Sequence, residues 1–381
     1  MKNAIETRCI HGDSNGLKDE HRAISYPIYQ TASFSHIKTG HNESGFDYSR
    51  ESNPTRQVLE DIVSSLEGAA GTVAFSSGMA AITVCFELFS PGDHILCTDD
   101  LYGGVVRLHN LINKKNGLLI DYVDTSDLSA VRDAVRPNTK AIYVETPSNP
   151  MMHVTDLAAC AEIAKEHGLL LIVDNTFLSP YFQNPLALGA DIVVHSGTKF
   201  LSGHNDTVAG FLSAKDPQLA AKIRLLSKTT GGVLAPFDCW LVTRGIKTLA
   251  VRMERQEANA KKVVDWLLTA PGVTEVYYPG LKSHPGYEVS TRQTRGFGSM
   301  ISFRVDSEET ALRVLQKVKL VIFAESLGGT ESLVTYPTIQ THPDVPEEVK
   351  ERLGITKTLL RLSVGLENAD DIIADLEQAL E

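Results

Sequence analysis

Short apolar runs rich in β-branched residues alternate with longer amphipathic stretches between residues 72 and 214. The runs predict strands at residues 72–75, 94–97, 119–123, 141–144, 169–173, 192–194 and 208–212. The stretches between them predict helices that include residues 79–88, 131–135 and 157–167. Strands that alternate with helices form a mostly parallel sheet covered by helices. Ligands of such sheets bind beyond the carboxyl ends of the strands.

The pattern changes after residue 240, where fewer strands are interleaved with helices. Residues 240–268 predict a long helical stretch rich in Arg, Lys and Glu. Further elements are predicted as strands at 273–277, 300–305 and 359–364 and as helices near 308–317 and 369–380. We therefore expect a second, smaller α+β domain in the last third of the chain.

Residues 1–60 are polar and show little periodicity. Such a segment suits an arm that packs on a neighbouring subunit. The chain is long enough for two domains besides such an arm. We expect an arm at 1–60, a large α/β domain at 61–240 and a small α+β domain at 241–381.

Composition narrows the class of protein. The 381 residues are 43% hydrophobic and their mean hydropathy is −0.07, which is typical of a soluble globular protein. The net charge of −11 and the lack of a polybasic run argue against nucleic-acid binding. No apolar run approaches the length of a membrane span. Because Met1 to Glu6 also lack the apolar stretch of a signal peptide, we expect a cytoplasmic protein.

The cysteines and histidines give no sign of metal chemistry. The five cysteines and twelve histidines lack ligand spacing, so we predict no metal site. Three of the cysteines lie in apolar segments, which suits reduced thiols in a core. His204, His284 and His342 are interpreted as surface or capping residues.

Two charged residues follow apolar runs of the predicted sheet. Lys199 lies among small hydroxyl residues just after the run at 192–195, and Asp174 ends another run. Adjacent strand ends would present this amine and this carboxylate at one rim of the sheet. A cofactor with an aldehyde, a basic ring nitrogen and a phosphate needs that set, and pyridoxal phosphate (PLP) is one. The lysine forms the Schiff base, and the carboxylate keeps the ring nitrogen protonated.

Small residues after the first predicted strand offer a phosphate site. The run from Ser76 to Ala81 follows a strand and opens a helix, whose first amides attract anions. Gly78 lets the backbone approach closely. Such a turn is also a common structural device, but Ser196 and Thr198 add hydroxyls that suit the same phosphate.

Other polar residues stand out against their surroundings. Tyr102 follows a strand on a glycine-rich turn, where its ring would stack on a heterocycle and its phenol would move protons if its pKa were lowered. Asn149 also follows a strand and would reach over a pocket. Arg361 interrupts an apolar strand and needs a partner, either a substrate carboxylate or a structural salt bridge. In the arm, Tyr48 and Arg50 suit phosphate recognition or a solvated loop.

Taken together, these stretches resemble the trans-sulfuration enzymes, the Cys/Met-metabolism family of PLP enzymes with the aspartate-aminotransferase fold (fold type I). The resemblance covers nearly the whole chain and rests on residues 48–55, 77–79, 102, 149, 174, 195–199, 325–329 and 361–365. It implies a large domain with a mostly parallel sheet and a smaller C-terminal α+β domain. It further implies PLP as the cofactor, small amino acids as substrates, and a homotetramer built as a dimer of dimers.

The resemblance also implies roles for single residues. Lys199 would be the Schiff-base lysine, Asp174 the partner of the ring nitrogen, and Tyr102 the stacking residue with a catalytic part. The residues implied to hold the phosphate are Ser77, Gly78, Met79, Ser196 and Thr198, joined by Tyr48 and Arg50 from the adjacent subunit. Arg361 would bind the substrate carboxylate, and the other implied substrate residues are Asn149, Ser326, Glu325 and Asp47.

Four positions bear on the activity within the family. Gly104 stands where methionine γ-lyases carry cysteine, and Leu327 stands where proteobacterial cystathionine β-lyases carry tryptophan. Asp47 and Glu325 are similar to cystathionine γ-synthases and suit the distal amino group of cysteine or cystathionine. We therefore expect γ-replacement of O-acylhomoserine by cysteine, with cystathionine γ- or β-lyase as the alternative. A non-catalytic PLP-binding regulator, an alternative of another class, has no chemical need for the lysine, aspartate and tyrosine together.

Overall fold

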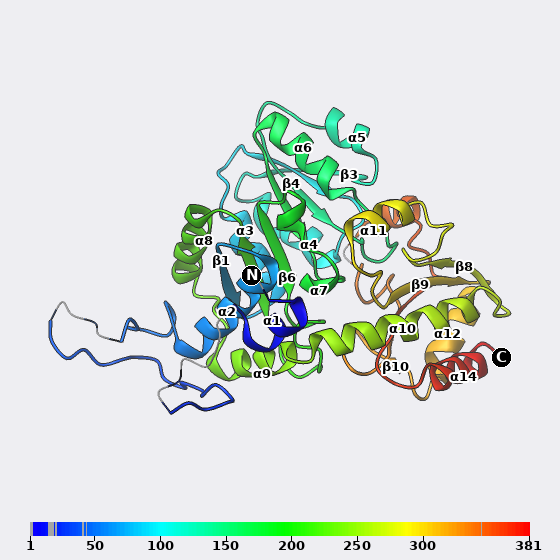
Figure 1. The fold of residues 1–381 in the computed structure, drawn as a ribbon. Coiled ribbons are helices and arrows are strands. Elements are labelled where there is room, and N and C mark those ends of the chain that lie inside the picture. Colours follow the sequence, from blue (N-terminus) through cyan, green and yellow to red (C-terminus); the bar gives the residue numbers. More distant parts are fainter. Residues whose placement is uncertain (1–2, 14–18, 20, 40–41, 43, 344) are drawn as a thin grey trace.

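The computed structural model describes residues 3–13, 19, 21–39, 42, 44–343 and 345–381, and Figure 1 shows its fold. Met1 and Lys2, which bear on the expected lack of a signal peptide, lie outside the described residues. Within the described ranges, no helix has the length and apolar character that a membrane crossing requires. Two sheets, of seven and five strands, organise this part of the chain.

The larger sheet has the strand order β1-β7-β6-β5-β4-β2-β3. Its strands are β1 (Gly71–Phe75), β2 (His94–Thr98), β3 (Leu119–Val123), β4 (Thr139–Glu145), β5 (Leu170–Asp174), β6 (Ile192–Ser196) and β7 (Gly210–Ala214). Five neighbouring strands, from β3 to β6, are parallel, and β7 is antiparallel to both β6 and β1. Each predicted strand of this sheet is found within two residues of its expected ends, which confirms the mostly parallel sheet.

Alternation along β4 explains how helices cover both faces of this sheet. Ile142 and Val144 pack in one core cluster with residues of α6 (Leu157–His167). Tyr143 points to the other face, into a cluster that contains residues of α3 (Gly78–Phe86). Successive side chains of a strand leave on opposite sides, so a strand buried on both faces reads as a continuous apolar run.

The other helices around this sheet are α2 (Pro54–Glu67), α4 (Gly103–Leu108), α5 (Leu128–Asp133), α7 (Ser179–Phe182) and α8 (Pro217–Thr230), with a π-helical turn at His109–Asn113 and a 3₁₀ turn at Pro185–Leu188. Side-chain oxygens cap the first turns of α2, α3, α5, α6 and α8 by accepting backbone N–H bonds. Such caps satisfy amides that a helix leaves free, and so they fix where each helix begins.

The smaller sheet has the order β10-β11-β12-β9-β8. Its strands are β8 (Val273–Tyr277), β9 (Met300–Val305), β10 (Ile322–Phe323), β11 (Leu333–Thr335) and β12 (Leu359–Ser363). The helices of this part are α11 (Tyr287–Gln293), α12 (Glu308–Lys317), α13 (Glu347–Leu353) and α14 (Ala369–Leu380). In Figure 1 this part lies to one side of the larger sheet, and a long helix, α10 (Leu249–Leu267), reaches from one part to the other.

The segment predicted as helical at 240–268 is helical in the structure, but it is divided into two helices, α9 (Pro236–Ile246) and α10. Thr248 breaks the helical geometry with φ −108° and ψ 7°. At the break, the Gly245 carbonyl accepts a hydrogen bond of 2.9 Å from the guanidinium of the buried Arg252, which also donates to Phe200 O at 2.8 Å. The apolar spacing continues across the break, so the pattern does not reveal it.

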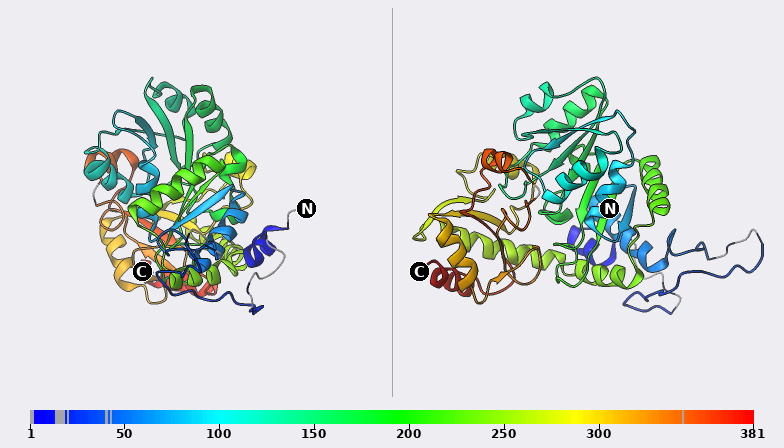
Figure 2. Two further views of the ribbon diagram at one scale, coloured as in Figure 1. Left: turned by 90° about the vertical axis from the view of Figure 1, so that its left-hand side faces the viewer. Right: turned by 180° about the vertical axis from the view of Figure 1, so that it is seen from behind.

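The first 60 residues hold more regular structure than predicted. They include α1 (Ile5–His11) and the start of α2. Between these helices, the described residues run away from the body of the molecule in Figure 1 and in the right-hand view of Figure 2. Several apolar side chains of this segment between α1 and α2 are exposed, namely Ile24, Ile28, Tyr29, Ile37 and Tyr48.

Candidate functional site

A cavity of about 300 Å³ lies at the carboxyl ends of β4, β5 and β6. Its walls come from segments of both sheets, and the place agrees with the rule for parallel sheets. The predicted site residues that line it are Ser77, Gly78, Met79, Tyr102, Asn149, Asp174, Ser196, Thr198, Lys199, Glu325, Ser326 and Arg361. The fold therefore brings together residues that are up to 284 positions apart in the sequence.

Lys199 lies in the turn after β6. Its Nζ donates a hydrogen bond to Ser326 Oγ at 2.9 Å. Burial, with the nearby positive charge of Arg361, lowers the pKa of Lys199 to about 8, and the Glu325 carboxylate opposes this shift. An amine with a lowered pKa is partly neutral near pH 7, as a nucleophile or base must be.

Asp174 is the last residue of β5 and is buried. Its Oδ1 accepts hydrogen bonds from the Thr176 hydroxyl at 2.6 Å and from the Thr176 N–H at 3.0 Å. The Tyr143 hydroxyl donates to Oδ2 at 3.4 Å. Burial raises the pKa of Asp174, while the bonds from Thr176 lower it. The result is a held carboxyl group on the cavity wall, suited to accept a bond from a protonated ring nitrogen.

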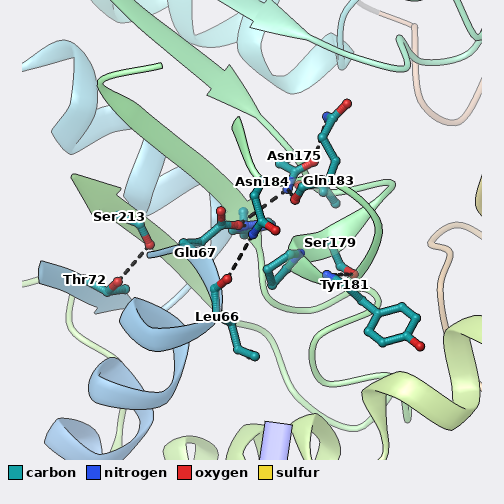
Figure 3. Close-up of polar contacts among 12 residues, drawn as sticks. Leu66, Glu67, Thr72, Asn175, Ser179, Tyr181, Gln183, Asn184 and Ser213 are labelled. Carbon is teal, nitrogen blue, oxygen red and sulfur yellow. Dashed lines mark hydrogen bonds and ion pairs between the residues drawn. The ribbon is translucent and has the colours of Figure 1, made fainter. Parts of the chain in front are cut away.

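A buried polar network supports the strand ends beside Asp174, and Figure 3 shows part of it. Asn175 Nδ2 donates to Gln183 O at 2.9 Å and to Glu67 Oε1 at 3.5 Å. Glu67 Oε1 also lies 2.5 Å from His195 Nε2, with both side chains almost fully buried. Because Asn175 and His195 lie at the ends of β5 and β6, the network links α2 to both strands that present charged site residues.

A small-residue cradle forms the wall around the start of α3. Ser77 caps this helix, since its Oγ accepts the N–H of the third residue on at 3.0 Å. A Cβ placed on Gly78 would lie only 3.0 Å from Ser196 Cβ, so the two segments touch. Thr198 Oγ1 is held by the Ala209 N–H at 3.0 Å. Helix amides and hydroxyls thus converge where a phosphate is expected.

Arg361 is buried on β12 and donates to three neutral oxygens. Nη1 bonds Asn149 Oδ1 at 2.7 Å, and Nη2 bonds Ser326 O at 3.2 Å and Thr335 Oγ1 at 3.3 Å. Among the residues that the structure describes, no carboxylate lies within the 4.0 Å of a salt bridge to it. Burial lowers the pKa of Arg361 to about 10, which leaves it charged, and a carboxylate ligand would meet an unpaired cation.

Ser326 joins the two cations of the cavity. Its hydroxyl accepts from Lys199 and its carbonyl accepts from Arg361. Its φ of 112° lies in a region that non-glycine residues rarely adopt. The neighbouring Gly328 fixes this turn by donating its N–H to Ser363 Oγ at 2.8 Å.

Tyr102 lines the cavity at the turn before α4, and its N–H donates to Glu145 Oε2 at 3.0 Å. Burial and the negative charge of Glu325 raise the pKa of Tyr102. The condition for proton transfer by its phenol, a lowered pKa, is therefore not met in this structure. The aromatic ring on the cavity wall remains suited to stacking.

Three predicted site residues do not line the cavity of their own chain. Asp47 Oδ1 pairs with His36 Nε2 at 2.8 Å on the exposed arm. Arg50 Nη1 donates to Lys228 O at 2.6 Å, and its guanidinium lies 5.4 Å from the centre of the Tyr48 ring. Within a single chain these side chains lie apart from Lys199, so their part in a neighbouring site stays a prediction.

Other cavity residues are not indicated by the sequence patterns, and they are Ile82, Glu145, Thr176, Phe177, Val208 and Thr341. Glu145 carries a usable signal, because it ends β4 and lies opposite Asp174 in register. Burial, with the charge of Asp174, raises the pKa of Glu145 well above its usual range. The remaining residues lie in segments without a distinctive polar pattern.

The cysteines and histidines show one agreement and one correction. All five cysteines are free and buried, as expected of thiols in a core. The expectation that His342 lies at the surface or as a cap is wrong, since it is 1% exposed and residues distant in sequence cover it. In the described part of the chain, no group of three metal-ligating side chains is found.

The residues around the cavity fit PLP. Lys199 offers an amine for its aldehyde, and Asp174 offers a carboxyl group for its ring nitrogen. The start of α3 with Ser77 and Ser196 offers donors for its phosphate, where the contact of Gly78 with Ser196 leaves no space for a Cβ.

Comparisons with known proteins agree with this interpretation. The family model described as Cys/Met metabolism PLP-dependent enzyme matches residues 6–381. A cystathionine gamma-lyase of Bacillus subtilis is 49% identical over 376 residues, 99% of each chain, and a cystathionine beta-lyase of Lactococcus lactis is 47% identical over 378 residues, again 99% of each. The crystal structure of a cystathionine gamma synthase from Xanthomonas oryzae, in complex with aminoacrylate and cysteine, has a TM-score of 0.96 at 37% identity and covers 100% of this chain and 98% of its own. The chain therefore belongs to the Cys/Met-metabolism family of PLP-dependent enzymes, with the fold of the cystathionine lyases and synthases.

Proposed function

We propose that this enzyme is a lyase that cleaves a C–S bond of cystathionine. The observation that carries the proposal is the Arg361 guanidinium, which has no salt bridge in the described structure and shares a cavity with Lys199 and Glu325. Cystathionine has an α-carboxylate that suits Arg361 and a distal ammonium group that suits Glu325. The cavity thus offers Arg361 as a partner for the carboxylate at the reacting end and Glu325 as a partner for the ammonium group at the distal end.

Each side chain has a definite task in such a cleavage. Arg361, oriented by its bond to Asn149, binds the α-carboxylate and places the α-hydrogen near Lys199. PLP, when bound, supplies the electron sink that makes the α-proton acidic. Lys199 Nζ, whose pKa is about 8, accepts this proton and returns a proton to the departing sulfur. Ser326 Oγ, 2.9 Å from Nζ, holds the amine between the two positions.

One consideration favours cleavage over synthesis. The relatives that match 99% of this chain at 47–49% identity are described as lyases. Cystathionine γ-synthesis remains the second candidate, because Glu325 would hold the ammonium group of cysteine equally well.

The proposal includes a shared site. Tyr48 and Arg50, on the arm at residues 1–60, would complete the cavity of a neighbouring subunit, whose large and small domains span 61–240 and 241–381. The exposed apolar side chains of the arm support this, since they would be covered by a second copy. The active unit would then be at least a dimer, within a tetramer built as a dimer of dimers.

Product analysis tests the proposal. The purified, PLP-loaded enzyme is incubated with cystathionine alone, and separately with O-acetyl- or O-succinylhomoserine plus cysteine. A γ-lyase gives 2-oxobutanoate and cysteine, a β-lyase gives pyruvate and homocysteine, and a synthase gives cystathionine from the second mixture. Faster formation of cystathionine than of either 2-oxo acid would overturn the proposed direction.

A further inference from the structure

His342 is a buried histidine outside the predicted site. It lies in the segment after β11 and is 1% exposed. Its Nε2 is 3.0 Å from Asn149 O and 3.2 Å from Leu101 O, and its Nδ1 is 2.7 Å from Thr341 Oγ1. One imidazole ring therefore contacts three separate polar groups.

The chemistry of these contacts fixes the protonation of the ring. Both partners of Nε2 are carbonyl oxygens, which only accept, so Nε2 carries a hydrogen. Nδ1 then accepts from the Thr341 hydroxyl. Burial, with the nearby charge of Arg361, lowers the pKa of His342 to about 4, so the ring is neutral at physiological pH. His342 is thus a neutral donor that shares one N–H between two backbone carbonyls.

The two carbonyls belong to segments that carry predicted site residues. Leu101 immediately precedes Tyr102, and Asn149 receives the bond from Arg361 through its own side chain. Both segments follow strands of the larger sheet, whereas His342 and Arg361 belong to the part that contains the smaller sheet. The ring therefore links the two parts of the chain at the cavity.

Close packing reinforces this link. A Cβ placed on Gly103 would lie 2.3 Å from Thr341 O, so the Tyr102 turn and the segment of His342 touch backbone to backbone. Thr341 itself lines the cavity. A shift of the His342 segment toward the Tyr102 turn would therefore force this turn to move.

We propose that His342 is a positioning residue, whose Nε2–H holds the Tyr102 turn and the Asn149 backbone in a fixed place relative to Arg361. Through these two segments it aligns the aromatic wall and the carboxylate-binding group of the cavity. The benefit for catalysis rests on the proposed function, whereas the control of the two segments is a property of the chain itself.

Hydrogen exchange of the PLP-free protein tests the structural claim directly. In His342→Leu, which removes the donor at similar volume, we expect at least tenfold faster exchange in peptides that cover residues 101–105 and 148–152. In His342→Gln, whose amide can reach the same carbonyls, exchange returns toward the wild-type rate. His94→Leu is the matched control, because His94 is also fully buried. It is the first residue of β2, whereas the Tyr102 turn follows the last residue of the same strand.

Kinetics of the loaded enzyme tests the consequence for the site. We expect His342→Leu to raise the KM for cystathionine at least fivefold, and His342→Gln to restore it. The proposal would be overturned if the two peptides exchanged at the wild-type rate in His342→Leu. It would also be overturned if His94→Leu accelerated their exchange as much as His342→Leu does, or if His342→Gln and His342→Leu exchanged equally fast. If His342→Leu fails to fold, His342→Gln is compared with His342→Asn, whose shorter amide cannot reach the carbonyls. Equal exchange rates in these two variants would then overturn the proposal. Because exchange is measured without PLP or substrate, its result stands even if the chain proves to have another activity.

Discussion

The Nζ of Lys199 and the Oγ of Ser326 are joined by a hydrogen bond of 2.9 Å that connects the turn after β6 to the turn before β11. The hydroxyl belongs to a residue with φ 112°, so the contact depends on a strained backbone. Such strain persists where the surrounding structure holds it, and here it places the serine between an amine and the guanidinium of Arg361.

Two substitutions of Ser326 separate the effect of its hydroxyl on catalysis from the effect of its strained backbone on stability. Ser326→Ala and Ser326→Gly both remove the bond to Lys199, so we expect each to lower kcat about tenfold, since such a bond is worth about 1–1.5 kcal/mol. Glycine also relieves the strain, so the Gly variant should be more stable than the Ala variant by about 1 kcal/mol.

Steady-state kinetics and urea unfolding measure these two effects of Ser326 substitution. Ser227→Ala, a buried serine on α8, controls for the loss of any buried hydroxyl. Equal stability of the Gly and Ala variants would show that the turn carries no usable strain.

The lowered pKa of Lys199 predicts how stability depends on pH. The pKa is about 8 in the folded, PLP-free chain against an ordinary value of 10.5, so the unfolded chain binds more protons between these values. The free energy of unfolding of the wild type should therefore rise with pH across pH 8–10.5, relative to Lys199→Met, by up to about 3 kcal/mol. Urea unfolding of both proteins at several pH values measures the difference, and a constant difference would contradict the lowered pKa.

Complementation tests the shared site. Arg50→Ala and Lys199→Ala should each be inactive as pure proteins. After dissociation and reassociation of an equal mixture, hybrids contain some sites with both wild-type residues, and on the order of a quarter of the wild-type activity should return. Hybrids that form, as shown by differently tagged chains, but stay inactive would exclude an arm that acts across subunits.

Glu325 tests the recognition of the distal ammonium. A charge-assisted contact contributes about 1.5–3 kcal/mol, so Glu325→Gln should lower kcat/KM for cystathionine tenfold or more. Elimination from O-acetylhomoserine, which has no distal ammonium group, should change far less. If both substrates lose the same factor, Glu325 maintains the cavity in general and recognises no second ammonium group.

The site residues that could be predicted from the sequence are those whose position follows from the segment in which they lie. Asp174 and Lys199 follow apolar runs, and the rule that parallel strands end at one rim is enough to place them together. The same rule applies to Glu145, which ends β4, but its place beside Asp174 depends on a register that the sequence does not display.

Contacts between distant segments lie beyond the sequence patterns. The buried ring of His342 contacts the carbonyls of Leu101 and Asn149, which are far from it in the sequence. The residues around position 342 show no pattern that predicts these contacts. The break between α9 and α10 is similar, because the Gly245 carbonyl beside it accepts a bond from Arg252, whose other carbonyl partners include Phe200. Such features depend on hydrogen bonds that a buried polar group makes with distant segments. The spacing of apolar residues along the chain does not predict these bonds.

The placement of β1 has a consequence for how the protein is made. Among the described strands of the larger sheet, β1 pairs only with β7, although five other strands lie between them along the chain. On the ribosome, β1 therefore has no strand to pair with until β7 has been synthesised, and its unpaired edge must stay protected meanwhile. The start of α3, directly after β1, contacts Ser196 at the end of β6, so the phosphate cradle is completed only after β6 has been synthesised.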